Sequence, residues 1–596
     1  MQSIYGNAEK GDESQMNQAL LIFTIGPVKS FIQGSRKVRD LYAGSYLLGH
    51  LMKQLGDELE SKLKQGSNII FPSRNAGGHI PNRLIADLRG YSLEEARRLG
   101  EEMEEYVRQA FYKVCADVIK ASISEITLPM ERQIQSFLEV YWVVEAYEDY
   151  AAGYRKAVES LHAVKRIRCF TQMDEPAGRK CSLYPELNAI FARRRANKQG
   201  EALVLPRYIA RESLVKLKQQ DTLPAFLNEK EALSSIAFAK RGLDDYQNKF
   251  KEEFPHYSLE ISSVAYMLLR RRLKNQAFAE ELPMLKNQAS EAIYDLQSGF
   301  VLNTEEYSSK EIRIAEAIYR KIQEEEIFLS PYYAIVKIDG DSLGNIYQDL
   351  GEYKLHQALS EALCKFAEDA ETLVKKNDGI CIYAGGEDIL AFLPLDTVFP
   401  AILQMRRVFR ETMIGFIGEK KEGLTFSAGV VVAHLMSPMN AVLKTAETME
   451  REAKSVDKNK NGFAISVYKR SGETVVVKSG FGDQDAKMNA LWRCIQALRN
   501  KNYSRSFVYG LMRVLSPLIN SDEKCLNQMV EVLILQALCK AERSLSDEEA
   551  QNIKAMFYEC YCKEASKGLA HYLDMLNVIL FLSREVCDVY STSCSR

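Results

Sequence analysis

The sequence predicts a multidomain α+β protein, and three observations lead to that prediction. The chain has 596 residues, which at roughly 150 residues per domain corresponds to about four domains or subdomains. Charged residues make up 27% and hydrophobic residues 46%, the balance of a globular protein with several apolar cores. Strand and helix patterns alternate in two parts of the chain, and long helical patterns separate and follow them. A largely disordered chain, a collagen and a coiled-coil rod are excluded.

The N-terminal part combines strand and helix patterns. Residues 1–18 are polar, and we expect a flexible tail. The apolar run 19–26 predicts a strand that ends before Pro27. A helix is expected over 28–55 and a short strand over 68–72, so this region predicts a small α/β unit.

The next part is expected to be mainly helical. Residues 92–164 have apolar positions at three- and four-residue spacing, which predicts helices. Residues 165–230 lose this period and contain Cys169 and Cys181. We interpret both as thiols, because no second pair of ligands follows to complete a zinc site. Helical patterns return over 231–330.

The second α/β unit, residues 331–480, shows the sharpest alternation. Strands are expected over 332–339, 379–386, 388–394, 424–434 and 463–470, and helices over 353–376, 397–417 and 439–455. This β-α-β-β-α-β-α-β order is the split βαβ, or ferredoxin-like, plan with an extra unit. From residue 481 to the end we expect only helices.

Two acidic motifs of this unit are expected to meet at one edge of its sheet. The first strand ends in the sequence IDGD, and the turn between the second and third strands reads AGGED. In the split βαβ plan the first and third strands are antiparallel neighbours. We therefore expect Asp339, Glu387 and Asp388 to converge.

Converging carboxylates repel one another and favour a bound cation. Their hard oxygen atoms suit Mg²⁺ or Mn²⁺, and two such ions can stabilise the attacking oxygen and the leaving pyrophosphate of a nucleotidyl transfer. Gly340, Gly385 and Gly386 leave backbone accessible to a phosphate. A Gly-Gly-acid hairpin turn also occurs as a purely structural feature. The hypothesis therefore depends on the two motifs meeting.

Four further residues are weaker candidates for contacts with a nucleotide. Asp341 and Ser342 follow the first strand, and Asp341 either joins the metal ligands or caps the turn. Lys454, in the helix before the last strand, and Arg470, just after that strand, could reach triphosphate oxygens. The alternative for both cations is a solvated surface position.

Charge and missing motifs exclude several functions. The 78 Lys+Arg and 80 Asp+Glu residues give a net charge of −2, which excludes coating of nucleic acid by charge alone. The basic clusters 193–195 and 270–272 are interpreted as exposed faces, with contact to RNA or a partner as the alternative. No P-loop motif occurs, and no histidine is followed by aspartate. Scattered cysteines, no signal peptide and no membrane-length apolar run predict a cytoplasmic protein.

Several segments resemble one known family. Residues 24–51 (TIGPVKSFIQGSRKVRDLYAGSYLLGHL), the sequences PNRLIA, SSIAFAKRGL, GGEDILAF and YKRSGE closely resemble the large, polymerase-like subunit of type III-B CRISPR (Cmr) effector complexes. The resemblance covers nearly the whole chain, most specifically 24–51 and 332–472. It implies two ferredoxin-like palm (cyclase/polymerase-like) domains, a helical or irregular insert and a C-terminal α-helical domain.

This resemblance assigns the domains. They are a tail (1–18), a first palm (19–91, completed by part of 205–325), a helical and irregular insert with a degenerate zinc region (92–230), a helical region that completes or links the first palm (231–330), a second palm (331–480) and a C-terminal helical domain (481–596). The first palm has Ile25-Gly26-Pro27 where the family's acid would stand, so it is expected to be catalytically silent.

The resemblance also implies an activity. Asp339, Glu387 and Asp388 would hold two Mg²⁺ or Mn²⁺ ions, and target RNA bound by the complex of CRISPR RNA and other Cmr subunits would switch on synthesis of cyclic oligoadenylate from ATP. Joining of ATP to S-adenosylmethionine is an alternative product. A non-catalytic scaffold and a GGDEF-like dinucleotide cyclase are the alternative functions.

Three departures from the family pattern affect these expectations. The optional N-terminal HD nuclease domain is not found before the first palm, so cleavage of single-stranded DNA is not expected. The zinc quartet is reduced around residues 180–186, which argues against zinc. The turn carries Glu387 where the family has aspartate, and this longer ligand could shift the preference for metal or product.

Overall fold

The computed structural model of the chain describes most of its 596 residues in two compact units. The described residues are 18–73, 80–167, 175, 178–192, 226–227, 231–285, 289–303, 307–417, 424–458, 460–500, 503–520, 523–541, 545–561 and 568–586. One unit groups residues 1–34, 43–257 and 343–364, and the other groups 35–42, 258–342 and 365–596. Residues 1–17 and most of 165–230, including Cys169 and 193–195, lie outside the described residues.

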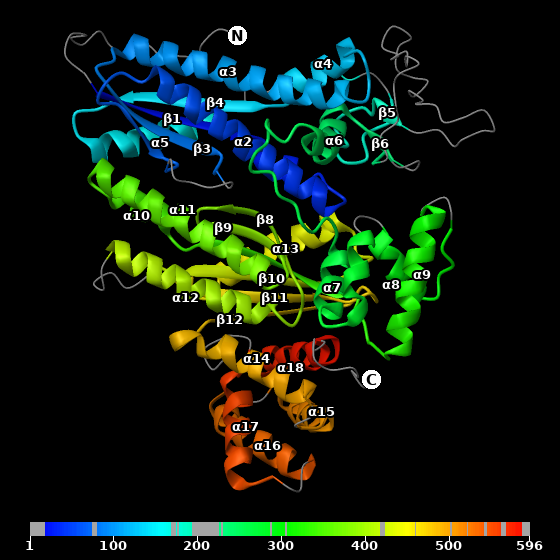
Figure 1. Cartoon of the computed structure of the whole chain (residues 1–596). Helices are drawn as coiled ribbons and strands as arrows, with labels where there is room; N and C mark the ends of the chain where they lie inside the picture. Colours follow the sequence, from blue (N-terminus) through cyan, green and yellow to red (C-terminus); the bar gives the residue numbers. More distant parts are fainter. Residues whose placement is uncertain are drawn as a thin grey trace. The chain divides into compact units, whose positions relative to one another are not determined.

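The first unit is built on a four-stranded antiparallel sheet (Figure 1). Its strands are β1 (Gln18–Gly26), β2 (Asn68–Phe71), β3 (Arg83–Arg89) and β4 (Glu139–Ala146), in the order β2-β3-β1-β4. Its helices are α1 (Val28–Gln33), most of α2 (Val38–Lys62), α3 (Leu93–Lys120), α4 (Leu128–Gln135), α5 (Tyr150–Arg166), α6 (Ser235–Lys249), α10 (Leu343–Asp349) and the start of α11 (Tyr353–Lys376). A two-residue pair, β5 (Phe191–Ala192) and β6 (Ala232–Leu233), forms a separate small sheet.

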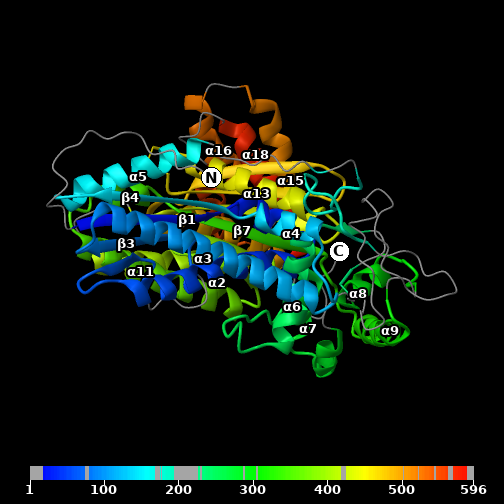
Figure 2. The same cartoon turned by 90° about the horizontal axis from the view of Figure 1, so that it is seen from above.

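Helices α3 and α5 cover opposite faces of this sheet, as the view in Figure 2 helps to follow. Leu20 and Ile22 of β1 belong to a buried cluster that also contains Leu161 of α5. The alternate β1 residue Phe23 is in register with Trp142 of β4. The Trp142 ring lies so close to Gly100 of α3 that a β-carbon there would come within 2.6 Å of it. Successive side chains of β1 point to opposite faces of the sheet, so one set packs towards α5 and the other lies on the face that α3 covers.

Five strands were not expected from the sequence: β3, β4, β12 and the two-residue strands β5 and β6. β4 falls inside the segment 92–164 that was expected to be helical throughout. Its aromatic and β-branched residues favour a strand, but most of them are only half-buried, and its partner β1 is about a hundred residues away. The fourth strand of the sheet is β4, and the part of residues 205–325 described in this unit contributes α6 and the short β6.

The second unit is built on a six-stranded sheet in the order β12-β11-β10-β7-β9-β8. The strands are β7 (Tyr332–Gly340), β8 (Ile380–Gly385), β9 (Asp388–Leu393), β10 (Phe426–His434), β11 (Gly462–Tyr468) and β12 (Thr474–Gly480). β10 and β11 are parallel, and the other neighbours are antiparallel. With α12 (Val398–Ile417), α13 (Met439–Lys454) and most of α11, the expected strand and helix order is confirmed, and β12 extends it.

Helices make up the rest of the second unit. They are α7 (Val264–Leu273), α8 (Ala289–Gln297), α9 (Ser309–Glu324), α14 (Ala486–Arg499), α15 (Arg505–Leu515), α16 (Glu523–Ala541), α17 (Asp547–Glu559) and α18 (Gly568–Glu585). Helix α14 packs on α17 and α18, and α18 also contacts β12 (Figure 1). The predicted mixed α+β fold with a C-terminal helical region is therefore present. No helix among the described residues is long and apolar enough to cross a membrane.

Candidate active site

The two acidic motifs meet where β7 ends and β9 begins. The antiparallel register pairs Ile338 with Ile389, so the next residues, Asp339 and Asp388, are cross-strand neighbours. Their carboxyl groups lie close enough to interact, and the neighbouring Asp339 raises the pKa of Asp388. The predicted convergence of strand one with the following hairpin therefore holds for these two aspartates.

A tight hairpin turn presents the third acidic residue. Gly385 pairs with Asp388, which leaves Gly386 and Glu387 as the two turn residues. Gly386 has a φ of 75°, a conformation that glycine adopts without strain. A β-carbon built on Gly385 would meet nothing within 4 Å, so the backbone there faces open space. A phosphate could approach this turn closely.

The neighbouring carboxylates disturb the protonation of Asp388. Burial raises the pKa of Asp388 well above its ordinary value, and the neighbouring Asp339 and Glu387 charges raise it further. Lys337 acts in the opposite direction. Tyr383 of β8 is affected by the same cluster: burial, then the charge of Asp388, raises the pKa of its phenol well above the ordinary value. Without a counter-cation, the two aspartates cannot both be ionised at low cost.

Two lysines and one glutamate form a charged network beside the aspartates. Lys454 forms an ion pair with Asp339 and a second one, of 3.0 Å, with Glu450. Lys337 lies 2.7 Å from Glu450. Burial lowers the pKa of Lys454, but its bonds to Asp339 and Glu450 outweigh burial and raise it. The lysine is therefore charged and lies next to the aspartate pair.

Close packing of α13 on the sheet positions this lysine. A β-carbon on Gly429 of β10 would come within 2.4 Å of the backbone nitrogen of Glu450, and one on Gly462 of β11 within 2.3 Å of the carbonyl oxygen of Ala453. Both positions therefore require glycine, because helix backbone cannot move aside cheaply. The two glycines hold the C-terminal turn of α13, with Glu450 and Lys454, over the strands.

Asp341 has a structural role rather than a place in the site. It is 1% exposed, and its carboxylate accepts hydrogen bonds from the hydroxyls of Thr425 (2.7 Å) and Ser427 (2.8 Å) and from the backbone of Asn461 (3.0 Å). Both oxygens are thereby used to tie β7 to β10 and to the start of β11. The sequence left two roles open for Asp341, a metal ligand or a cap of the turn, and this geometry fits the cap. Ser342 is exposed, with a φ of 61°.

Arg470 does not lie near the aspartates. Its backbone nitrogen donates to the hydroxyl of Tyr332, the first residue of β7, whereas Asp339 is near that strand's other end. The expectation that it reaches the same triphosphate is therefore wrong, because β11 runs away from the acidic edge of the sheet. Arginines of the basic cluster 270–272 also bind groups of the protein itself. Arg271 forms ion pairs with Asp396 and Asp378, and Arg272 donates to the carbonyl oxygen of Phe328.

The donor set fits a divalent cation only in part. Among the described residues, no group of three or more His, Cys, Asp or Glu side chains is arranged to hold a metal ion. The structure brings Asp339 and Asp388 together, and the charge of Glu387 raises the pKa of Asp388. Mg²⁺ is commonly held by one or two carboxylates together with substrate phosphates and water. Two paired aspartates beside an open glycine turn fit that arrangement. Cys181 is buried, with its sulfur 3.2 Å from the backbone nitrogen of Ser234.

Sequence reasoning missed two charged residues of this network. Lys337 lies two residues before Asp339 on β7, so it shares the face of the sheet with that aspartate. Glu450 precedes Lys454 by four residues on α13, the spacing of a helical ion pair. Both spacings can be read from the sequence, but only the packing of α13 against β7 shows that the two pairs join.

Comparison with known proteins supports the same region. The model of the Cas10/Cmr2 second palm domain matches residues 332–464, and the model of the Cmr2 N-terminal region matches residues 20–83. The Cmr subunit Cmr2 of Pyrococcus furiosus is 23% identical over 641 residues, covering 91% of this chain and 71% of that protein. The CMR subunit Cmr2 of Saccharolobus solfataricus is 23% identical over 211 residues, covering 29% of this chain and 20% of that protein.

Solved structures show a similar fold. A chain of the type III-B Cmr-beta complex in its apo state superposes with a TM-score of 0.68 at 15% identity, covering 96% of this chain and 82% of that chain. A chain of Cmr-beta bound to cognate target RNA gives a TM-score of 0.66 at 16% identity, covering 96% and 83%. The fold likeness therefore extends over almost the whole chain, beyond the two matched regions.

Proposed function

Because the chain belongs to the Cmr2 (Cas10) family, we propose that it is the subunit of a type III-B effector complex that makes a nucleotide second messenger from ATP. The single observation that supports this best is the Asp339–Asp388 pair beside the Gly385-Gly386 turn. Paired carboxylates with open backbone suit a metal-bound triphosphate. The names of the relatives suggest the partners: other Cmr subunits, CRISPR RNA and target RNA.

The proposed reaction is a nucleotidyl transfer. The oxygen of an acceptor hydroxyl bonds to the α-phosphorus of ATP and its proton passes to water. The bond from that phosphorus to the bridging oxygen breaks, and pyrophosphate leaves with the electron pair. Bound Mg²⁺ or Mn²⁺ would lower the pKa of the hydroxyl and offset the charge on pyrophosphate. Asp339 and Asp388 would hold the cations, with Glu387 available from the turn. Cyclic oligoadenylate and an ATP–S-adenosylmethionine conjugate remain alternative products.

Lys454 would change partner when the nucleotide binds. Its ammonium group pairs with Asp339 and Glu450 in the structure. Once cations offset the aspartates, the same ammonium group can turn to the triphosphate, which carries more negative charge than one carboxylate. This lysine would therefore keep the site neutral without nucleotide and bind phosphate with it.

A non-catalytic scaffold is the second candidate, and one observation favours it. The Lys454–Asp339 ion pair already compensates one of the carboxylates, as it would in a purely structural site. The deciding experiment feeds labelled ATP, with and without S-adenosylmethionine, to the assembled complex with target RNA. Mass spectrometry should find a product that needs Mg²⁺ or Mn²⁺ and is lost in Asp339→Asn/Asp388→Asn. Undiminished product from that variant would overturn the proposal, and no product from the wild-type complex would favour the scaffold.

A further inference from the structure

A second cavity lies at the opposite end of the six-stranded sheet from the aspartates. It has a volume of about 640 Å³ and is lined by Tyr332, the first residue of β7, and His434, the last residue of β10. Asp339 is seven residues further along β7, or roughly 23 Å at about 3.3 Å per residue. The cavity is therefore separate from the candidate active site.

Three arginines from different elements line this cavity. Arg470 follows β11, Arg505 is the first residue of α15, and Arg584 lies in the last turn of α18. Glu585 is the only carboxylate among the described lining residues. Burial, then the charge of Arg470, lowers the pKa of His434, which keeps its ring neutral at pH 7. Three arginines and one glutamate leave two positive charges (3 − 1 = 2) on a chain whose net charge is −2.

The single carboxylate of the lining can balance only one of the three arginines, so an excess of positive charge remains. Arg505 donates to the carbonyl oxygen of Ser583 (2.9 Å), and Arg584 donates to the hydroxyl of Tyr509. Both acceptors are neutral. Glu585 accepts a hydrogen bond from Ser330 (2.7 Å). Guanidinium groups that converge on one cavity repel one another, and an anion between them would relieve that repulsion.

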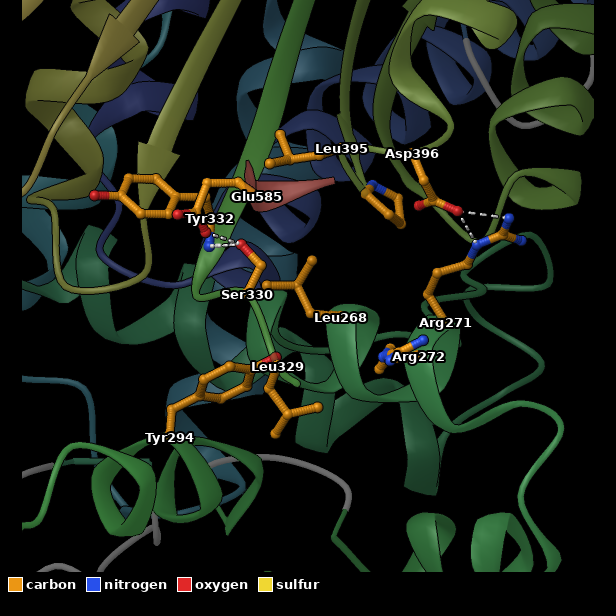
Figure 3. A pocket seen from close by; sticks show the side chains of 11 residues that line it. Leu268, Arg271, Arg272, Tyr294, Leu329, Ser330, Tyr332, Leu395, Asp396 and Glu585 are labelled. Carbon is orange, nitrogen blue, oxygen red and sulfur yellow. Dashed lines mark hydrogen bonds and ion pairs between the residues drawn. The ribbon is translucent and has the colours of Figure 1, made fainter. Parts of the chain in front are cut away.

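A smaller neighbouring cavity shows the contrasting case (Figure 3). It holds only about 30 Å³ and shares Tyr294, Tyr332 and Glu585 with the larger one. There Arg271 points to Asp396, with a nitrogen–oxygen distance of 2.7 Å, so a carboxylate of the protein itself balances its charge. At the same end of the sheet, one arginine is neutralised internally, whereas three others line a larger open space that holds a single described carboxylate.

We infer that the larger cavity, here called the arginine cavity, binds the phosphate group of a nucleotide or of an RNA strand. Its volume lies within the roughly 300–1,000 Å³ typical of small-molecule sites. A guanidinium group can donate two parallel hydrogen bonds to two oxygens of a phosphate. The positive N-terminal end of the α15 dipole, at Arg505, adds to the positive potential of the arginines. The rings of Tyr294 and Phe328 supply apolar surface for a base. The inference does not depend on the proposed catalytic function.

Binding to the full-length chain tests this site. Isothermal titration calorimetry in EDTA, which suppresses cation-dependent binding at the aspartates, would use three probes: pyrophosphate, AMP and a five-nucleotide adenylate RNA. Arg470→Gln/Arg584→Gln should weaken binding at least about tenfold, because two charge-assisted contacts with the phosphate are lost. Arg407→Gln/Arg493→Gln, which removes two exposed arginines outside the cavity, is the matched control and should bind as the wild type does.

The three probes separate the sources of the phosphate. Binding of AMP and pyrophosphate supports a free nucleotide, and binding of the RNA alone supports a strand phosphate. Arg470→Glu, a change in an exposed turn, repeats the test if the double variant is unstable, and it should also weaken binding at least about tenfold. The inference is overturned if no probe binds the wild type at millimolar concentration, or if the cavity variants bind as well as the control.

Discussion

The two sheets of this chain surround an aspartate carboxylate in opposite ways. Asp87 of β3, in the first sheet, is fully buried and accepts hydrogen bonds from the hydroxyl of Tyr147 (2.6 Å) and from Arg89 (2.9 Å). Asp388 of β9, in the second sheet, lies against another aspartate, and its pKa is raised well above the ordinary value by burial and by that neighbour. The first carboxylate is satisfied within the protein. The carboxyl group of Asp388 lies beside a second carboxyl group, and a bound cation would compensate the negative charge of the pair.

This difference separates a structural acid from a chemical one. A buried carboxylate with a cationic partner stabilises the fold, whereas two adjacent carboxylates cost stability until a cation binds. The first sheet also lacks an acid at the end of β1, which finishes in Ile25-Gly26. The proposal that only the second sheet carries out chemistry follows from these two contrasts, and the predictions below are arranged to break or sharpen them.

The largest expected effect comes from removing charge at the aspartate pair. Asp339→Asn/Asp388→Asn should lower product formation at least about a thousandfold, because the cations and the triphosphate lose their ligands. The melting temperature should change little, because relief of the repulsion between the carboxylates and loss of the Lys454–Asp339 ion pair act in opposite directions. Turnover of labelled ATP and differential scanning fluorimetry measure the two effects. Loss of activity together with a large fall in melting temperature would contradict the contrast with Asp87.

The next effect concerns the packing that positions Lys454. Gly429→Val should destabilise the fold by about 1–3 kcal/mol, because its side chain would meet the backbone of α13 at Glu450. Displacement of that helix should also lower turnover about tenfold or more. Gly510→Ala in α15 is the control: a β-carbon there meets nothing within 4 Å, so stability should rise by about 0.5–1 kcal/mol. Unchanged turnover in Gly429→Val would contradict a role for the position of Lys454 in the reaction.

A smaller effect, on stability alone, is expected in the first sheet. Asp87→Asn removes the charge that Arg89 and Tyr147 bind, at a cost of about 1–3 kcal/mol. Turnover per folded molecule should not change. Urea denaturation followed by an activity assay of the same sample tests both statements. A fall in turnover per folded molecule as large as that of the aspartate variant would remove the distinction between the two acids.

The smallest effect is a pH dependence of stability. The raised pKa of Asp388 means that the folded protein holds this proton more tightly than the unfolded chain. The linked stabilisation is complete below the unfolded pKa of about 3.9 and is lost as pH rises through the folded pKa. The melting temperature of the wild type relative to Asp388→Asn should therefore fall from about pH 4 towards neutrality. Mn²⁺ with ATP should reverse that fall, and a difference that does not vary with pH would contradict the raised pKa.

The sequence predicted the second sheet far better than the first. From β7 to β11 the strands alternate with helices and lie close together in the chain, so local patterns suffice. β4 was missed because it lies between helices and gains its stability from pairing with distant β1. The same limit applies to the site. The convergence of Asp339 and Asp388 followed from topology, but the packing of α13 that brings Glu450 to Lys337 did not.

Single residues at the ends of helices and strands were the least predictable. Lys454 and Arg470 looked equivalent in sequence, yet the first lies on the aspartates and the second at the far end of the sheet. The direction of β11 decides this, since it runs parallel to β10 and away from Asp339. Asp341 had two possible roles, and only its contacts with Thr425 and Ser427 favour the structural one.

The most direct test is to locate a cation at the aspartate pair. Crystals of the full chain with Mn²⁺ and a non-hydrolysable ATP analogue would give an anomalous difference map. The account predicts a manganese peak at about 2.1 Å from carboxylate oxygens of both Asp339 and Asp388, with Lys454 turned to the triphosphate. A map with bound nucleotide in which manganese lies elsewhere, and Lys454 still pairs with Asp339, would contradict it.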